Sequence, residues 1–184
     1  MINLRVSSNF SGSLQEWSRY VSYWRWFFVG GLLFLTGCQT TKKIDFDPVV
    51  ARFYMEMNPS EGYNQPVRLP VSGISLAVHP DPVLSETDLV NVDLVKVDLG
   101  LCLSFDLDNS AGRDLYRLTV NNQGRRLVLS LNNAPVGIRM IDQPFSTGNI
   151  LIFVELPDED LEELVINLKK TTAEVQKALQ KSRR

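Results

Sequence analysis

The chain has 184 residues, of which 44% are hydrophobic and 22% are charged. This composition is typical of a folded globular protein and excludes a disordered or fibrous one. Its 19 basic and 21 acidic side chains give a net charge of -2, and the basic residues are scattered, so we expect no nucleic acid as a partner. One His and two Cys are too few for a structural zinc site, and we expect no metal and no cofactor.

The first element is predicted to be an export signal. Residues 26–35 are all apolar or glycine, and basic side chains precede them at Arg5, Arg19 and Arg25. The run has 10 residues, about half of the ~20 that a membrane-spanning helix needs. A short apolar run behind a basic segment is typical of a secretory signal, so we interpret residues 1–37 as a cleaved signal peptide.

The end of this signal, Leu35-Thr36-Gly37-Cys38, resembles the lipobox of bacterial lipoproteins. The resemblance implies cleavage before Cys38 and attachment of diacylglycerol, with its palmitate-like acyl chains, to the Cys38 thiol. Several acyl chains on one residue give lasting membrane attachment. The alternative is an ordinary signal peptide, or a short anchor helix, with an incidental cysteine. Gln39 stands where Asp would retain a lipoprotein at the inner membrane, so we expect an outer-membrane lipoprotein facing the periplasm.

The mature chain then runs over 38–184, which is 147 residues and long enough for one domain with a sizeable core. Residues 38–50 are polar near their start and are interpreted as a lipidated tether. Lipidation of Cys38 leaves Cys102 without a disulfide partner. No basic residue or histidine neighbours Cys102 in the sequence, so we do not expect a catalytic thiolate there.

Residues 51–80 are predicted to form N-terminal strands and a linker. Alternating apolar and aromatic side chains favour a strand over 51–57, and shorter strand segments are expected at 67–69 and 74–78. The segment His79-Pro80-Asp81-Pro82 is a rigid connector, because each proline holds the preceding residue in an extended conformation.

Residues 81–184 carry a clearer alternation of strands and helices. Strands are predicted over 88–99, 101–107, 127–131, 136–141 and 150–156. The apolar phase of the first of these changes between Leu94 and Val95, which indicates a β-bulge. Asn132 and Asn133 begin a hairpin turn.

Two helices complete this pattern. One is expected after an N-cap at Asn109 or Ser110, and ends at 121–124. The other begins at Pro157 and runs to about Lys181, with acidic residues at its start and basic residues at its end. Its apolar stripe predicts core packing near the start and last turns that project. A coiled-coil partner is the weaker alternative, because Thr171 and Thr172 interrupt the stripe.

The predicted fold class is α+β, a largely antiparallel sheet with two helices packed on one face. The other face of the sheet is unusual because most of the side chains that alternation points outward there are apolar. They are Cys102, Val128, Ile141, Leu151 and Phe153. Either residues 51–78 cover this face, which we favour, or it is an open surface that binds a partner.

Residues 81–178 resemble the head region of the first periplasmic domain of SecD, a subunit of the bacterial protein-export machinery. The residues that carry the resemblance are Pro82-Val83-Leu84, Asp88-Leu89, the small-residue helix start Ser110-Ala111-Gly112, Leu118-Thr119, Asn122, Gly124, Pro144 and Gly148. The resemblance implies an α+β head that contacts emerging polypeptide. It supplies no catalytic residues to transfer, and the membrane domain that drives the translocase has no counterpart once the signal is removed.

The main hypothesis is therefore a lipid-anchored envelope module that binds a protein or an unfolded polypeptide through a sheet face or an edge strand, in connection with protein export. The alternative is a structural accessory lipoprotein of an envelope complex that docks through its terminal helix. A third hypothesis is a hydrolase in which His79 and Asp81 activate an unidentified serine. The position of His79 in a connector, between Val78 and Pro80, counts against it.

Overall fold

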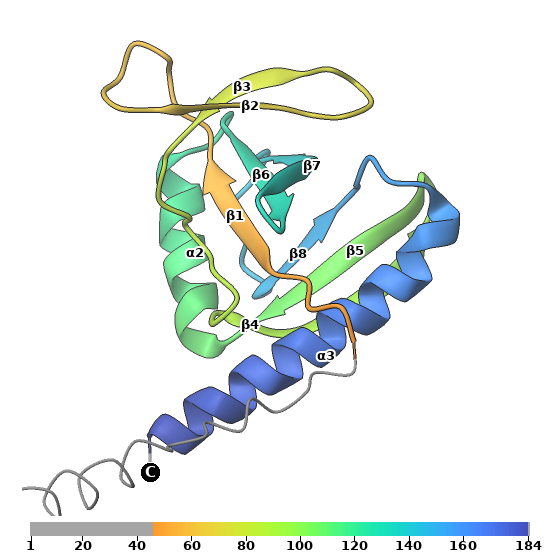
Figure 1. The fold of residues 1–184 in the computed structure, drawn as a ribbon. Coiled ribbons are helices and arrows are strands. Elements are labelled where there is room, and N and C mark those ends of the chain that lie inside the picture. The colour runs from red at the N-terminus through yellow and green to blue at the C-terminus, as the bar shows by residue number, and fades with distance from the viewer. Residues whose placement is uncertain (1–45, 184) are drawn as a thin grey trace, which may run out of the picture. The chain divides into compact units, whose positions relative to one another are not determined.

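The computed structural model describes residues 46–183 and shows ten elements of secondary structure (Figure 1). The predicted signal peptide and the lipobox lie outside the described residues. In chain order the elements are β1 (Ala51–Met55), β2 (Gln65–Arg68), β3 (Ser75–Val78), β4 (Leu89–Val97), β5 (Gly100–Leu107), α2 (Asn109–Asn121), β6 (Arg126–Leu131), β7 (Ala134–Met140), β8 (Asn149–Ile152) and α3 (Asp158–Ser182). All the strand pairs are antiparallel, so the predicted α+β class is confirmed.

The first three-stranded sheet has the order β1-β6-β7. Leu131 pairs with Ala134, which leaves Asn132 and Asn133 as a two-residue turn with φ angles of 48° and 69°. Two successive positive φ angles match the twist of a tight hairpin, and asparagine tolerates them better than most residues. The hairpin predicted at these asparagines is therefore confirmed.

The second three-stranded sheet has the order β4-β5-β8. Its irregularity lies between Leu89 and Asn91, so the bulge predicted between Leu94 and Val95 is wrong. Leu94 and Val95 pair with successive residues of β5, and both are half-buried, one on each face of the sheet. The change in the apolar pattern of β4 therefore arises because both faces of the sheet are partly covered there, so that apolar side chains are accommodated on each face. The residue displaced at the real irregularity is Val90, which is 50% exposed.

The N-cap of helix α2 is Asp108, one residue before the first of the two predicted caps, Asn109 and Ser110. The Asp108 carboxylate accepts hydrogen bonds from the backbone N–H groups of Ser110 and Ala111, both at 2.7 Å. An N-cap aspartate satisfies donors that the first helical turn leaves unpaired. Asp108 therefore fixes where α2 starts, at the end of β5.

Helix α3 buries a stripe that includes both threonines thought to interrupt it. Thr171 and Thr172 are buried together with Leu161, Val165 and Leu168. The Thr171 hydroxyl donates to the Asn167 carbonyl at 2.9 Å and accepts from the Val49 N–H at 3.0 Å. These threonines are consequently part of the packing surface of α3.

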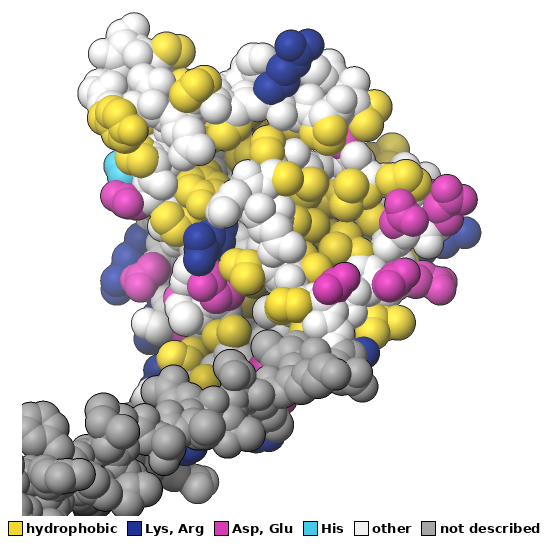
Figure 2. All heavy atoms as spheres, viewed as in Figure 1, with side chains coloured by type: hydrophobic (Ala, Val, Ile, Leu, Met, Phe, Trp, Pro, Cys, Tyr) yellow, Lys and Arg dark blue, Asp and Glu magenta, His cyan; other side chains and the backbone are white. Residues whose placement is uncertain are grey.

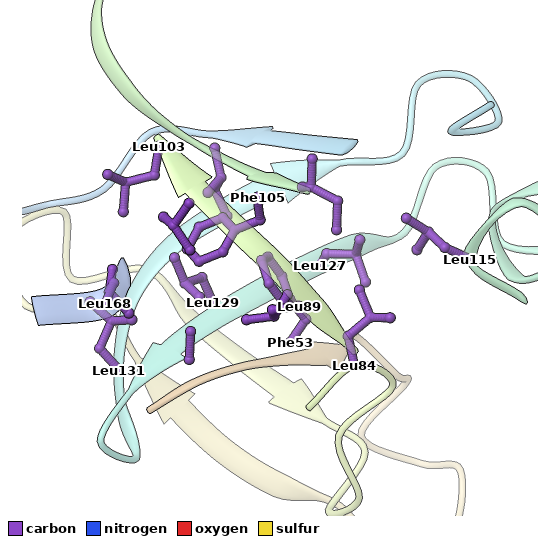
Figure 3. Close-up of a cluster of buried hydrophobic side chains, with 14 of the residues drawn as sticks. Phe53, Leu84, Leu89, Leu103, Phe105, Leu115, Leu127, Leu129, Leu131 and Leu168 are labelled. Carbon is purple, nitrogen blue, oxygen red and sulfur yellow. The ribbon is translucent and has the colours of Figure 1, made fainter. Parts of the chain in front are cut away.

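The two sheets and both helices share one hydrophobic cluster (Figure 3). Phe53 of β1 and Phe105 of β5 meet edge to face, with ring centroids 5.1 Å apart and ring planes at 90°. Such a pair contributes about 0.5–1.5 kcal/mol beyond the area that it buries. Leu115 of α2 and Leu168 of α3 reach the same cluster from opposite ends.

The hairpin β2–β3 stands apart from this cluster and covers part of the first sheet. Leu76 and Val78 of β3 bury Val128 of β6 in a second, smaller cluster. The far loop of the hairpin is held by Glu155, whose carboxylate accepts the N–H groups of Val71 and Ser72 at 2.7 and 2.9 Å. The expectation that N-terminal strands cover the second face thus holds for the area around Val128.

The two sheets approach each other closely at Gly137. An isolated bridge joins Gly137 of β7 to Val154 just after β8, and a Cβ on Gly137 would lie 2.5 Å from the Phe153 carbonyl oxygen. We expect Gly137→Ala to destabilise the domain by about 1–3 kcal/mol, because the backbone of one sheet must move. The measurement is the free energy of unfolding in urea.

Gly112→Ala is the matched control for this substitution. A Cβ there meets ordinary van der Waals contact, 3.4 Å from the Gly148 Cα, inside helix α2. We expect it to leave stability unchanged or to raise it by up to ~1 kcal/mol. Equal stability of the Gly137→Ala protein and the wild type would contradict the close approach.

The Glu155 contact predicts an acid dependence of the β2–β3 hairpin. Its hydrogen bonds with Ser72 and Val71 hold the pKa of the Glu155 carboxyl below its usual value of 4.5. A lowered pKa means that the contact stabilises the fold above pH 4.5 and is lost as the pH falls through the folded-state pKa. We expect Glu155→Gln to be less stable than the wild type at pH 7, with a difference that shrinks towards pH 3. Urea unfolding at both pH values checks this, and a difference independent of pH would contradict it.

Candidate functional site

The five residues predicted to share the second face of the sheet, either covered by residues 51–78 or open to a partner, are separated by the structure. Val128 is buried beneath the β2–β3 hairpin, and Ile141 is buried in the main cluster. Just after β7, the Ile141 N–H donates to the Arg125 carbonyl and the Ile141 carbonyl accepts from the Gly124 N–H, both at 2.9 Å. This pairing turns the Ile141 side chain inward, so assigning Val128 and Ile141 to an open surface is wrong.

Cys102, Leu151 and Phe153 lie together on the outer side of the β4-β5-β8 sheet. Cys102 pairs with Val95, and Ser104 pairs with both Asp93 and Leu151. Paired residues point to the same side of a sheet, so two small side chains of the central strand are flanked by larger ones. Cys102 is only 1% exposed, whereas Leu151 and Phe153 are 40% and 39% exposed. Of the three, Leu151 and Phe153 are therefore the side chains that a partner would touch.

Two hollows adjoin this outer face. The larger, of about 790 Å³, lies between the start of α2 and residues 146–148, and is lined by Asp108, Arg113, Tyr116 and Arg117 among others. The smaller, of about 190 Å³, is lined by Arg139, Phe145 and Leu151 among others. Both hollows share Ser146 and Thr147. One surface thus runs from the exposed side of β8, past the loop after β7, to the start of α2.

This surface combines apolar side chains with charges of both signs. Arg139 lies over the ring of Phe145, with its guanidinium carbon 5.8 Å from the ring centroid, and also donates to Asp142 at 3.4 Å. In the larger hollow Arg117 pairs with Asp114 at 3.3 Å on the exposed side of α2. Such a mixture suits a peptide backbone with varied side chains better than a ligand of a single charge.

The larger hollow is the part of the surface that sequence reasoning missed. Arg113, Tyr116 and Arg117 are three and four residues apart and so share one helix face, which is the available signal. Their facing wall at residues 146–148 comes from a loop far along the chain. Helical spacing alone does not show that a second wall exists.

The thiol of Cys102 is unsuited to catalysis. Burial raises its pKa above the usual value, and the charge of Arg139 opposes this only in part. A raised pKa keeps the thiol protonated at neutral pH, and the protonated form is a weak nucleophile. Cys102 therefore serves as a small apolar residue under the outer face.

Thiol chemistry tests this assignment. In a Cys38→Ala protein Cys102 is the single cysteine, and we expect it to react with a disulfide reagent at least tenfold more slowly in the folded protein than in urea, because the thiol is both shielded and protonated. The rate is read from the absorbance of the released thiolate. Equal rates in the folded and unfolded states would contradict the burial of Cys102.

His79 occupies a turn. Its Nδ1 atom accepts the N–H of Asp81 at 3.1 Å, its side chain is about half exposed, and Asp81 Oδ2 lies 4.0 Å from the ring. Among residues 46–183 no serine hydroxyl is hydrogen-bonded to this ring. The described chain also holds no group of three His, Cys, Asp or Glu side chains suited to a metal, and no helix in it is long and apolar enough to cross a membrane. The hydrolase hypothesis gains no support from the structure.

The fold is similar to solved structures of SecDF. One is a structure of SecDF described as a membrane component that enhances protein export, with a TM-score of 0.50, 18% identity and 68% of this chain covered. The domain has a SecD-like fold. A second is SecDF in a super-membrane-facing form, with a TM-score of 0.50, 18% identity and 67% of this chain covered. The match spans 63% of the first SecDF chain and 19% of the second.

Comparisons of sequence add no relative to these. No family profile matches the chain, and no curated protein matches it. The SecD resemblance identified from the residues is thus confirmed at the level of the fold.

Proposed function

We propose that this SecD-like domain is a lipid-anchored envelope module that binds unfolded polypeptide, in connection with protein export. The observation that carries the proposal is the outer side of the β4-β5-β8 sheet, where Leu151 and Phe153 are partly exposed beside two hollows. The SecD-like fold supports the same proposal, because the structural neighbour is described as enhancing protein export.

The chemistry of this surface fits an extended chain. Leu151 of β8 and Phe153 just after it are two residues apart and offer apolar contacts at the spacing of alternate side chains in a strand. Arg113, Arg117 and Arg139 can donate hydrogen bonds to carbonyl or carboxylate groups of a bound peptide. Binding of the polypeptide as an additional strand at the edge of β4 is the less favourable mode. The Leu89 carbonyl of that edge already accepts a hydrogen bond from Gln176 of α3 at 2.7 Å.

The proposed anchor is the acylated Cys38, with the domain on the periplasmic side of the outer membrane. The domain holds the chain from Val49 onward, since the N–H groups of Val49 and Val50 donate to Thr171 and Asn132. The predicted tether of residues 38–50 is thus attached to the fold at its last two residues. The segment before Val49 sets the distance between the anchor and the binding surface.

Charge introduced into the apolar part of the surface tests the polypeptide-binding proposal. We expect Leu151→Asp with Phe153→Asp to weaken binding of a reduced, carboxymethylated and permanently unfolded protein by at least tenfold, because carboxylates would replace two apolar contacts. Fluorescence anisotropy of the labelled unfolded protein gives the Kd.

Val90→Asp with Val120→Asp is the matched control. These valines are 50% and 43% exposed and lie outside the proposed surface, so we expect the Kd to stay within twofold of the wild type. If both pairs of substitutions weaken binding of the unfolded protein equally, or if neither pair weakens it, the proposed surface is contradicted. Circular dichroism of the wild type and both double variants checks that each one folds.

A cross-linked purification from membranes tests the cellular role. We expect the acylated protein to recover export-channel subunits or unfolded secretory chains, and a Cys38→Ala protein to lose them. Mass spectrometry of the captured proteins reads the result. Recovery of one fixed outer-membrane complex would instead favour the accessory-lipoprotein alternative.

A further inference from the structure

The charges of helix α3 are segregated along its axis. Residues 158–163 include five acidic side chains and no basic one, whereas residues 169–183 include five basic side chains and one acidic one. Figure 2 shows acidic side chains gathered over the start of this helix. The helix dipole favours such charges only within the first and last turns. The helix dipole does not explain Lys169, Lys170 and Lys177, which lie before the last turn. The long basic half of α3 therefore needs another explanation.

Two of these basic residues have partners inside the domain. Lys169 is paired with Asp93 of β4, and the Lys170 ammonium lies 5.6 Å from the ring centroid of Phe46. Lys177, Lys181 and Arg183 are exposed, and within residues 46–183 none of them forms an ion pair. We call these three residues the basic end of α3.

The basic end lies beyond the packed part of the helix. The buried residues of α3 stop at Thr172, and Gln176 donates hydrogen bonds to the Thr87 and Leu89 carbonyls at 3.1 and 2.7 Å. Figure 1 shows the end of α3 extending past β4. The three charges are therefore presented away from the core.

The chain joins the domain beside the same helix. Phe46 lies against Lys170, and the Val49 N–H donates to Thr171. Phe46 and Cys38 are eight positions apart in the sequence, a span of at most about 29 Å. From Lys170 to Ser182 the helix rises about 18 Å. An anchor at Cys38 therefore permits the basic end to reach the surface in which the anchor sits.

We propose that the basic end of α3, formed by Lys177, Lys181 and Arg183, docks on anionic lipid headgroups of the membrane that holds the acylated Cys38. This inference rests on the proposed anchor. Each basic side chain near an anionic bilayer strengthens association about fivefold. Glu163 lies about 21 Å along the helix from Lys177, beyond the screening length of about 8 Å at physiological ionic strength. The acidic half is thus too distant to oppose the docking, and the helix meets the membrane end on.

The experiment uses acylated protein carried by vesicles. Ser182→Cys supplies a labelling site beside the basic end, because Cys38 is acylated and Cys102 is buried. The fluorophore is read against a lipid with a spin-labelled headgroup, in vesicles of phosphatidylcholine alone or with 30 mol% phosphatidylglycerol. We expect at least threefold stronger quenching with phosphatidylglycerol at low salt, and loss of this gain at about 0.5 M salt. A label at Tyr63→Cys, in the loop between β1 and β2, is expected to show no gain.

Matched substitutions separate the basic end from the net charge. Lys177→Gln with Lys181→Gln is expected to remove most of the quenching gain. Arg68→Gln with Lys96→Gln changes two exposed basic residues elsewhere and is expected to retain it. The docking would be overturned if both pairs of substitutions reduced the quenching gain equally. It would also be overturned if the wild type were quenched equally in neutral and anionic vesicles.

The anchor is tested separately on the same protein. Intact mass reports acylation, and flotation with phosphatidylcholine vesicles reports anchoring that needs no charge. If intact mass shows no acyl chains and the protein does not float with the vesicles, the anchor and the docking are overturned together. An acylated protein that floats but shows no lipid-dependent gain overturns the docking alone. If a thiol reagent reacts slowly with the Ser182→Cys thiol in native membranes but rapidly in lipid vesicles, the basic end contacts a protein partner and the lipid docking is overturned.

Discussion

The close approach of β7 and β8 at Gly137 is the constraint on which the rest of the fold depends. The bridge to Val154 brings two three-stranded sheets edge to edge, and only a residue without a side chain fits against the Phe153 carbonyl. Once the edges meet, Phe53 and Phe105 face each other across the interior. Helices α2 and α3 then close the ends of one shared cluster. The outer side of β8 stays uncovered because both helices are used on the inner side.

Sequence patterns predicted the class of fold and most of its elements, since alternation along strands and apolar spacing along helices are local properties. The tight turn at Asn132 and Asn133 and the long helix after Pro157 were both accessible in this way. The covering of Val128 by the N-terminal strands was favoured from the sequence, but the burial of Ile141 was not predicted, because it depends on a chain that turns inward after β7. Period-two patterns assign a side, and tertiary contacts decide whether that side is open.

The candidate surface shows the same limit. Leu151 and Phe153 were identified from alternation, because neighbouring strands keep their pairing partners on one side. The hollow beside Tyr116 was missed, because its two walls lie about 30 residues apart in the chain. The N-cap at Asp108, by contrast, is a local signal, because its hydrogen bonds are to residues two and three positions later. It marks the start of α2 directly after the end of β5.

Helix α3 also has an electrical consequence. Its peptide groups alone would place about half a positive charge at the start and half a negative charge at the end. Five carboxylates near its start and five basic side chains along its second half exceed these partial charges, so the dipole moment of the whole helix points opposite to that of its backbone. A domain held through the proposed anchor and carrying such a helix would experience a torque near an anionic membrane. Under that proposal, the field of the membrane favours one orientation of the outer surface of β8 before any partner binds.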